Sequence, residues 1–295
     1  MSVNSKLFSY DNLVHAISGA VGSMVGMVVF YPFDTVRCRL QLDDSRKAKN
    51  TFKIIMDIAQ EEGIWSLYRG MVPVLQSICA SNFVYFYIYR ALKSSASAQE
   101  KNKDLVLASL AGIINVLLTT PLWMVNTRMK MSGVTHSYQY KSLLDGLLKV
   151  VKNEGAGTLW AGTLPSLLLV SNPAIHMAVY QAIKRRVPEE NLGALSYFLI
   201  SAVAKMVATV ATYPLQLVQT KLRHGHSSNE PGTLPKDAGT LQLFLYLLKR
   251  QGIPGLYKGM EAKLWQTVLT TALMFTAYEK IAIFVLTIMK GSKSK

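Results

Sequence analysis

Acidic residues are scarce in this chain of 295 residues: Asp and Glu number 17 against 32 Lys and Arg, which gives a formal net charge of +15. The chain has only two cysteines, Cys38 and Cys79, too few for a disulfide framework. The N-terminus predicts no cleavable signal peptide, because Lys6 is the only positive charge ahead of the first apolar stretch. The sequence also lacks a Walker loop, a carboxylate pair, a nucleophile constellation and metal-ligand spacing, so it predicts neither an ATP-driven pump nor an enzyme, and no bound metal.

Charge is missing altogether from four long apolar stretches, residues 12–33, 71–89, 105–127 and 161–183. Two more stretches are interrupted only by Lys205 in 191–220 and by Glu279 and Lys280 in 264–289. Each is about as long as the ~20 residues with which a helix crosses a bilayer. We therefore predict an all-α membrane protein with six transmembrane helices. The alternative is a soluble protein with six unusually long core helices.

Two landmarks recur three times in the same order. The first is a proline near the end of an apolar stretch: Pro32, Pro121 and Pro214, which stand 89 and 93 residues apart. The second is an acidic or amide residue followed by glycine, then an aromatic residue and another glycine; it spans residues 62–70, 154–162 and 251–259. This recurrence indicates three homologous units of about a hundred residues. We place them at residues 1–98, 99–190 and 191–295.

Each unit predicts an odd-numbered helix with a proline, a short surface helix and an even-numbered helix. The proline removes a backbone donor, so it should kink or break the odd helix. Such broken helices at repeat interfaces are typical of transporters, although any one of them can simply serve packing. The surface helices are predicted from apolar residues at helical spacing: Phe52, Ile55, Met56 and Ala59; Leu143, Leu147, Val150 and Val151; Leu241, Phe244, Leu245 and Leu248.

Lys205 is the most informative single residue, since a charge deep in an apolar stretch is costly unless it faces water or a partner. We predict that it contacts an anion; the alternative is a lysine that reaches the membrane surface with its ammonium group. Other polar residues within the stretches either bind substrate or form hydrogen bonds between helices. The predicted substrate-binding set is Lys205, Asn82, Asn115, Asn172, Lys263, Gln266 and Thr267.

The landmarks resemble those of the mitochondrial carrier (solute carrier 25) family. That family has Pro-x-acidic-x-x-basic-x-basic in each odd helix, then an acidic-Gly pair and an aromatic-basic-Gly group. Pro32, Asp34, Arg37 and Arg39 match the first pattern fully. The resemblance implies a monomeric six-helix barrel with pseudo-threefold symmetry, which exchanges solutes by alternating access. It implies no catalytic residue and no prosthetic group.

The resemblance also implies a gate at each end of the barrel. At the proline end, the acidic position of one unit would pair with the basic position of the next, here Asp34 with Asn126, Trp123 with Gln219, and Gln216 with Arg37. None of these is a complete ion pair, so we expect hydrogen bonds and a weaker gate there. The opposite gate would comprise Arg90, Lys93, Gln181, Lys184 and Glu279, in which Lys93 and Glu279 would form the ion pair.

Trp123 in place of an acid is similar to the branch of the family that carries nucleotides and nucleotide cofactors, as are residues 82–87, 115–123, 165–170, 172–175 and 261–267. That resemblance implies exchange of CoA, FAD, NAD and adenine nucleotides such as AMP and ATP across the peroxisomal membrane. Membrane lipids are expected partners, the peroxisomal membrane import machinery is a compatible one, and nucleic acid is not expected. The alternatives are a mitochondrial inner-membrane carrier of another anionic metabolite or nucleotide, or of protons, and a scaffold that transports nothing.

Overall fold

The computed structural model describes residues 25–42, 50–95, 101–131, 140–187, 193–225 and 239–273, and all regular structure in these residues is helical. The predicted all-α fold is therefore confirmed. The first unit forms α3 (Tyr31–Leu42), α4 (Thr51–Glu62), η1 (Ile64–Tyr68) and α5 (Met71–Ser95). The second forms α6 (Lys101–Lys130), α7 (Leu143–Glu154), η2 (Ala156–Trp160), α8 (Thr163–Leu168), η3 (Leu169–Ser171) and α9 (Asn172–Lys184). The third forms α10 (Ala194–His224), α11 (Thr240–Leu256) and a helix over residues 260–273.

Three helical segments in the described part of the chain are long and apolar enough to cross a membrane: Ile64–Lys93, Val106–Lys130 and Leu195–His224. They match three of the six predicted spans. The span predicted at 161–183 is divided into α8, η3 and α9, with Pro165 inside α8 and Pro173 in the first turn of α9. The spans predicted at 12–33 and 264–289 lie partly outside the described residues.

The three repeated prolines do not have the same effect. Before Pro32 the helix over residues 25–29 gives way to a turn at Phe30, and α3 starts at Tyr31, so the predicted break is present. Pro121 and Pro214 instead lie inside α6 and α10, which continue past them, so a break is wrong there and the predicted kink stays a prediction. A proline leaves the carbonyl four residues earlier without its helical donor. In α6 this is the carbonyl of Leu117, which accepts a hydrogen bond of 3.0 Å from the Trp160 indole.

The surface helices exist where the sequence predicts them, but their buried faces are partly different. In α4, Ile54 and Ile58 are buried, whereas the predicted Phe52 and Met56 are 47% and 62% exposed. In α11, Leu243 and Leu247 are buried, whereas Leu241 is 68% exposed. These helices are apolar on two faces, and the period alone does not say which one packs inward. The exposed apolar face is suited to the boundary between headgroups and lipid chains.

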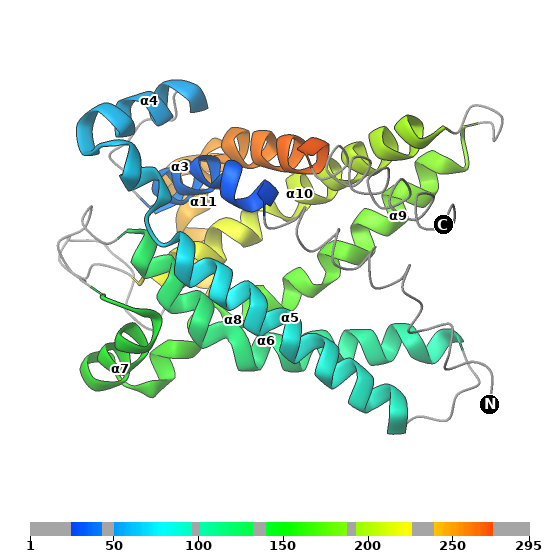
Figure 1. Ribbon diagram of the computed structural model, residues 1–295, viewed down its shortest axis with the longest axis horizontal. Helices are drawn as coiled ribbons and strands as arrows, with labels where there is room; N and C mark the ends of the chain where they lie inside the picture. The colour runs from blue at the N-terminus through cyan, green and yellow to red at the C-terminus, as the bar shows by residue number, and fades with distance from the viewer. Residues whose placement is uncertain are drawn as a thin grey trace, which may run out of the picture.

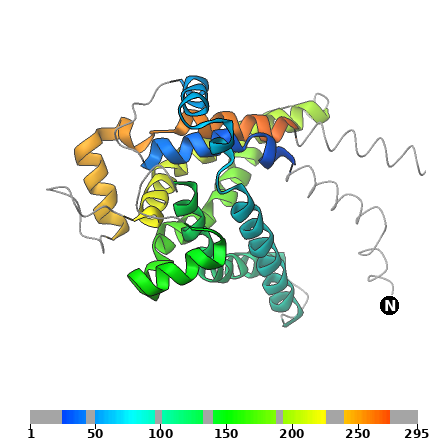
Figure 2. The same cartoon turned by 60° about the vertical axis from the view of Figure 1, so that its left-hand side comes forward.

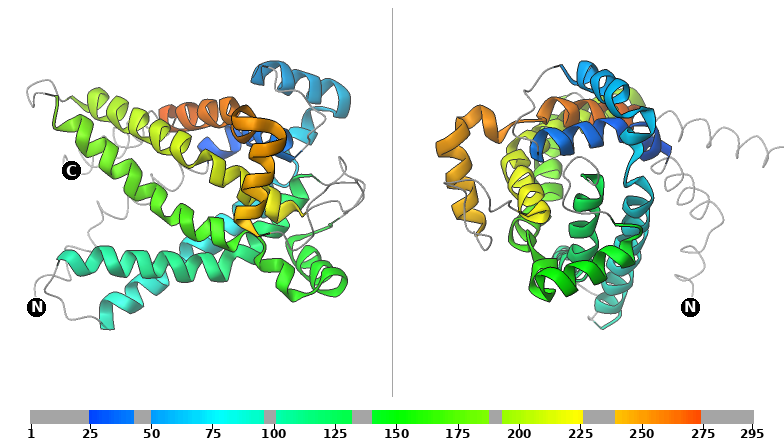
Figure 3. Two further views of the ribbon diagram at one scale, coloured as in Figure 1. Left: turned by 180° about the vertical axis from the view of Figure 1, so that it is seen from behind. Right: turned by 90° about the vertical axis from the view of Figure 1, so that its left-hand side faces the viewer.

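Each unit has its own small apolar core, in which the end of the odd helix packs against the surface helix. A representative core is that of the second unit, which joins Met124 and Val125 of α6 to Val150 of α7 and Leu159 of η2. Seen from one end of the molecule, α4, α7 and α11 lie on three sides of the bundle (Figures 2 and 3). α4 and α7 project at one end of the molecule (Figure 1), where they pack against the parts of α3 and α6 that follow Pro32 and Pro121. This is the proline end.

Two of the sequence landmarks meet in the same way within the first and third units. Tyr31, just before Pro32, stacks on Tyr68 with ring centroids 6.3 Å apart, and Tyr213, just before Pro214, stacks on Tyr257 at 6.1 Å. Both hydroxyl groups also donate to the carbonyl of the next landmark residue, Arg69 at 3.2 Å and Lys258 at 2.9 Å. The aromatic landmark therefore fixes the proline-bearing segment to the start of the even helix.

Candidate functional site

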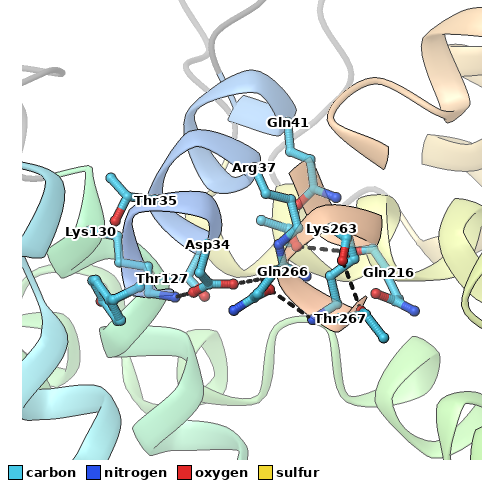
Figure 4. Close-up of polar contacts among 12 residues, drawn as sticks. Asp34, Thr35, Arg37, Gln41, Thr127, Lys130, Gln216, Lys263, Gln266 and Thr267 are labelled. Atoms are coloured by element: carbon cyan, nitrogen blue, oxygen red, sulfur yellow. Dashed lines mark hydrogen bonds and ion pairs between the residues drawn. The ribbon is translucent and has the colours of Figure 1, made fainter. Parts of the chain in front are cut away.

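Asp34 lies at the centre of the polar contacts at the proline end (Figure 4). It sits in the first turn of α3 and is 4% exposed. Its carboxylate accepts from the ammonium group of Lys130, at the end of α6, and forms an ion pair of 3.0 Å with Arg37 one turn along its own helix. Lys130 thus connects the first unit to the second.

The gate pairs predicted at this end are not formed. Asn126 forms no hydrogen bond with Asp34; its amide donates to Ser77 of α5 at 2.6 Å. Gln216 donates to Thr212 in its own helix at 3.1 Å, and Gln219 donates to Ser166 of α8 at 2.8 Å. The expectation of purely neutral contacts is therefore wrong at one boundary, because Lys130 lies one helical turn beyond Asn126 on the same face and supplies the missing charge.

Trp123, which holds the acidic position of the second unit, lies partly buried in α6, and its backbone carbonyl accepts a hydrogen bond from Thr127 at 2.9 Å. It brings no charge to the boundary between the second and third units. Arg223 instead donates to Ser166 there at 3.0 Å, beside the bond from Gln219. Two donors on one hydroxyl oxygen join α10 to α8 at this boundary.

Lys205 lies on α10 in a second polar cluster, whose other residues are Asn172 of the even helix α9 and Thr212 of α10. Its ammonium group is 3.4 Å from the amide oxygen of Asn172. Asn172 in turn donates to Thr212 at 2.7 Å. The oxygen of the Asn172 amide therefore faces the ammonium group of Lys205, while its nitrogen is held by Thr212. Lys205 and Asn172 are both partly exposed, so this charge does not have to be matched entirely by protein groups.

Lys263 stands on the helix over residues 260–273, close to the proline-end contacts (Figure 4). Its ammonium group donates to Gln266, one turn along the same helix, at 3.1 Å. Asp34, Arg37, Lys130 and Lys205 are near enough to act on it electrostatically. Arg37, Lys130 and Lys263, which come from three different helices, therefore share the carboxylate of Asp34, and Lys205 adds a fourth positive charge near Lys263.

The remaining predicted substrate-binding residues have different surroundings. Asn115 exchanges hydrogen bonds with Ser81 at 3.1 Å and 3.3 Å, which is the interhelical role that the sequence left open. The Thr267 hydroxyl group donates to the backbone carbonyl of Lys263 at 2.8 Å, which is a contact within its own helix. Asn82 is exposed on α5. The structure thus brings Lys205 and Asn172 together, and Lys263 and Gln266 together, and places Asn115 and Thr267 in structural bonds.

The predicted opposite gate is only partly described. Glu279 lies outside the described residues, so its pairing with Lys93 is not part of the structure. Lys93 forms an exposed ion pair of 3.2 Å with Asp104 at the start of α6. Lys184 lies 5.3 Å from the ring centroid of Tyr197, and Arg90 and Gln181 are exposed.

The comparisons with known proteins agree with this architecture. The family model described as mitochondrial carrier protein matches three times, at residues 9–100, 97–191 and 190–288. The chain belongs to the mitochondrial carrier family. It is a solute transporter and not an enzyme, as the sequence predicted.

Several relatives of this carrier are peroxisomal. The chain is 48% identical to peroxisomal membrane protein PMP34 of Mus musculus, over 98% of both proteins. It is 31% identical to peroxisomal adenine nucleotide carrier 1 of Glycine max, over 92% of the chain and 91% of the relative. It is 29% identical to the peroxisomal nicotinamide adenine dinucleotide carrier of Arabidopsis thaliana, over 96% and 97%. The predicted multi-pass protein of the peroxisomal membrane is thereby confirmed.

The carrier also contains two equivalent ion pairs that the sequence analysis missed. Arg39, at the end of α3, donates to both carboxylate oxygens of Glu62, which ends α4. Arg128, at the end of α6, donates in the same way to Glu154, which ends α7. Both arginine side chains are 2% exposed. The signal was present, since the two landmarks follow one another in the same order in both units, but their order alone did not show that they touch.

Proposed function

We propose that this carrier exchanges CoA, FAD, NAD and adenine nucleotides across the peroxisomal membrane by alternating access, as a monomer. The observation that supports this proposal is the imbalance of charge among the helices. Arg37, Lys130, Lys205 and Lys263 come from α3, α6, α10 and the helix over residues 260–273, and the nearby acid is Asp34. An excess of cations over acids in apolar surroundings is costly, and it suits a substrate with several phosphate charges.

Lys205 is the best residue for testing this proposal. Its contact with Asn172 is long, at 3.4 Å, and it has solvent access, so its ammonium group is available to a phosphate oxygen. A hydrogen bond to a charged group contributes about 1.5–3 kcal/mol. Replacing Lys205 by alanine should therefore weaken substrate binding by about 10- to 100-fold, with little loss of folded protein.

The experiment uses purified full-length protein in two steps. The first is a thermal-shift screen with CoA, FAD, NAD, AMP, ATP and dicarboxylates, because a ligand that binds the folded state raises its apparent Tm. The second is exchange of the ligands found, in liposomes, by wild type and Lys205→Ala at equal amounts of inserted protein. Lys149→Gln is the matched control, since it removes an exposed lysine of α7.

The outcomes separate the alternatives. A shift with CoA, dinucleotides or adenine nucleotides, lost in Lys205→Ala, supports the proposal and ranks the cargo. A shift with dicarboxylates alone refutes the cargo and favours a carrier of smaller anions. Uptake that does not require an internal substrate would contradict exchange as the mechanism.

A further inference from the structure

We propose that Lys130 and Asp34 form the single ionic lock of the proline-end gate, and that the lock has moved one helical turn away from the position at which the family pattern places it. The proposal rests on the contacts between units, and not on which cargo is carried. Of the three acidic positions of the pattern, Asp34 alone is an acid, because the other two are Trp123 and Gln216. Asp34 is thus the only carboxylate that the pattern supplies to this gate.

The cation expected to meet Asp34 is absent at its usual position. Asn126 is neutral, is 1% exposed, and is turned toward Ser77 of α5. Lys130 lies four residues later, which brings its side chain to the same face of α6. Its ammonium group reaches Asp34 across the boundary between the first and second units.

Three contacts fix the side chain of Lys130 in this position. The ammonium group pairs with Asp34 and lies 5.4 Å from the ring centroid of Tyr31. The aliphatic part passes the start of α5, where a Cβ on Gly70 would lie 3.2 Å from the Cγ of Lys130. Both charged side chains are nearly buried, at 10% exposed for Lys130 and 6% for Asp34. A buried, well-positioned pair is sensitive to the loss of either partner, unlike an exposed one.

The other two boundaries are held in a different way. Between the second and third units, Gln219 and Arg223 share the hydroxyl group of Ser166. Between the third and first units, Gln41 donates to the hydroxyl group of Tyr213 at 3.0 Å. Gln41 and Arg223 hold the same place after their prolines as Lys130 does after Pro121. One position of the repeat therefore closes all three boundaries, and only its lysine meets an acid.

Cys38 provides a native reporter of this gate. It lies one turn beyond Asp34 on α3 and is 2% exposed, so it should react slowly while the proline end is closed. Cys79 is exposed and is replaced by serine, which leaves one thiol. The assay measures the rate at which N-ethylmaleimide alkylates Cys38 in the full-length protein without cargo, by intact mass.

Lys130→Gln should raise the alkylation rate about tenfold or more, because the closed state loses a contact that the open state lacks. Lys130→Arg retains the charge and should keep the rate near that of wild type. Asp34→Asn, which removes the other partner, should act like Lys130→Gln and serves if that variant does not fold. Lys149→Gln controls for loss of an exposed ion pair, and Leu247→Ala controls for general loosening, since Leu247 belongs to the core of the third unit.

A rate for Lys130→Gln within about twofold of wild type would overturn the lock, since the populations would then be unchanged. So would a Lys130→Arg variant that reacts as fast as Lys130→Gln, or a Leu247→Ala variant of equal Tm that exposes Cys38 as much. Because no cargo is present, a failed lock leaves the proposed substrates standing. A failed cargo screen equally leaves the lock standing.

Discussion

Replacing Glu154 by glutamine should destabilise the second unit measurably, because Glu154 is the partner of a buried guanidinium. The Arg128 side chain is 2% exposed and donates with both terminal nitrogens to Glu154, while its third donor reaches the carbonyl of Arg223 at 3.3 Å. Breaking a buried ion pair costs about 3–5 kcal/mol. The Glu154 side chain is 24% exposed, so water screens part of this interaction, and glutamine keeps one acceptor. We therefore expect a loss of about 2 kcal/mol.

Thermal unfolding in detergent is the measurement. A loss of about 2 kcal/mol corresponds to a fall in Tm of roughly 4–8 °C, from the ~2–4 °C per kcal/mol of chains of this size class. Lys149→Gln breaks an exposed pair in the same helix, where the lysine is 43% exposed, and should lower the Tm by no more than about 1–2 °C. The reasoning fails if the Tm of Glu154→Gln is lowered no more than that of Lys149→Gln. It also fails if Glu62→Gln, the equivalent change in the first unit, has no effect.

Three further changes test other contacts by the same melting assay. Trp160→Phe removes the donor to the Leu117 carbonyl and should lower the stability by about 1 kcal/mol, since water can replace part of the hydrogen bond at a half-exposed site. A Tm equal to that of wild type would show that the carbonyl has another hydrogen-bond donor. Gly162→Ala should cost about 1–2 kcal/mol, because φ is +78° and the added Cβ would crowd the next odd helix; an unchanged Tm would contradict that strain. Gln251→Glu should raise the Tm by about 1–2 °C if the new carboxylate pairs with Lys221 as in the first two units; a decrease would show that the third unit is built differently.

The sequence was sufficient to predict the three units, the helical class and the family, because the prolines and glycines recur at nearly constant spacing. It was less sufficient for the packing of the surface helices. Phe52 and Ile54 are both apolar and lie two positions apart, and only tertiary contact decides which one is buried. Helical period identifies a face when one side of a helix is polar, and these helices have apolar residues on two sides.

The contacts of the proline-end gate were also beyond what the sequence could predict. Asn126 stands where the family pattern has a cation, so a reading of the pattern alone gives a gate without an ion pair. Lys130 lies outside the pattern, and its meeting with Asp34 depends on how α6 crosses α3, which is a property of the folded chain. Lys205 was different, because a lone charge in an apolar stretch is visible without any structure.

The two equivalent arginine–glutamate pairs have a mechanical consequence for a protein that must open and close. Each one fastens the end of an odd helix to the end of its surface helix, so in the first and second units the two helices turn together as one stiff lever. The third unit has Gln251 at the corresponding place and lacks the carboxylate for such a fastening. This place in the third unit therefore cannot hold an ion pair of the kind formed by Arg39 and Arg128. We therefore expect the three units of the carrier to differ in stiffness during opening, with less ionic support between α10 and α11 than between the equivalent helices of the first and second units.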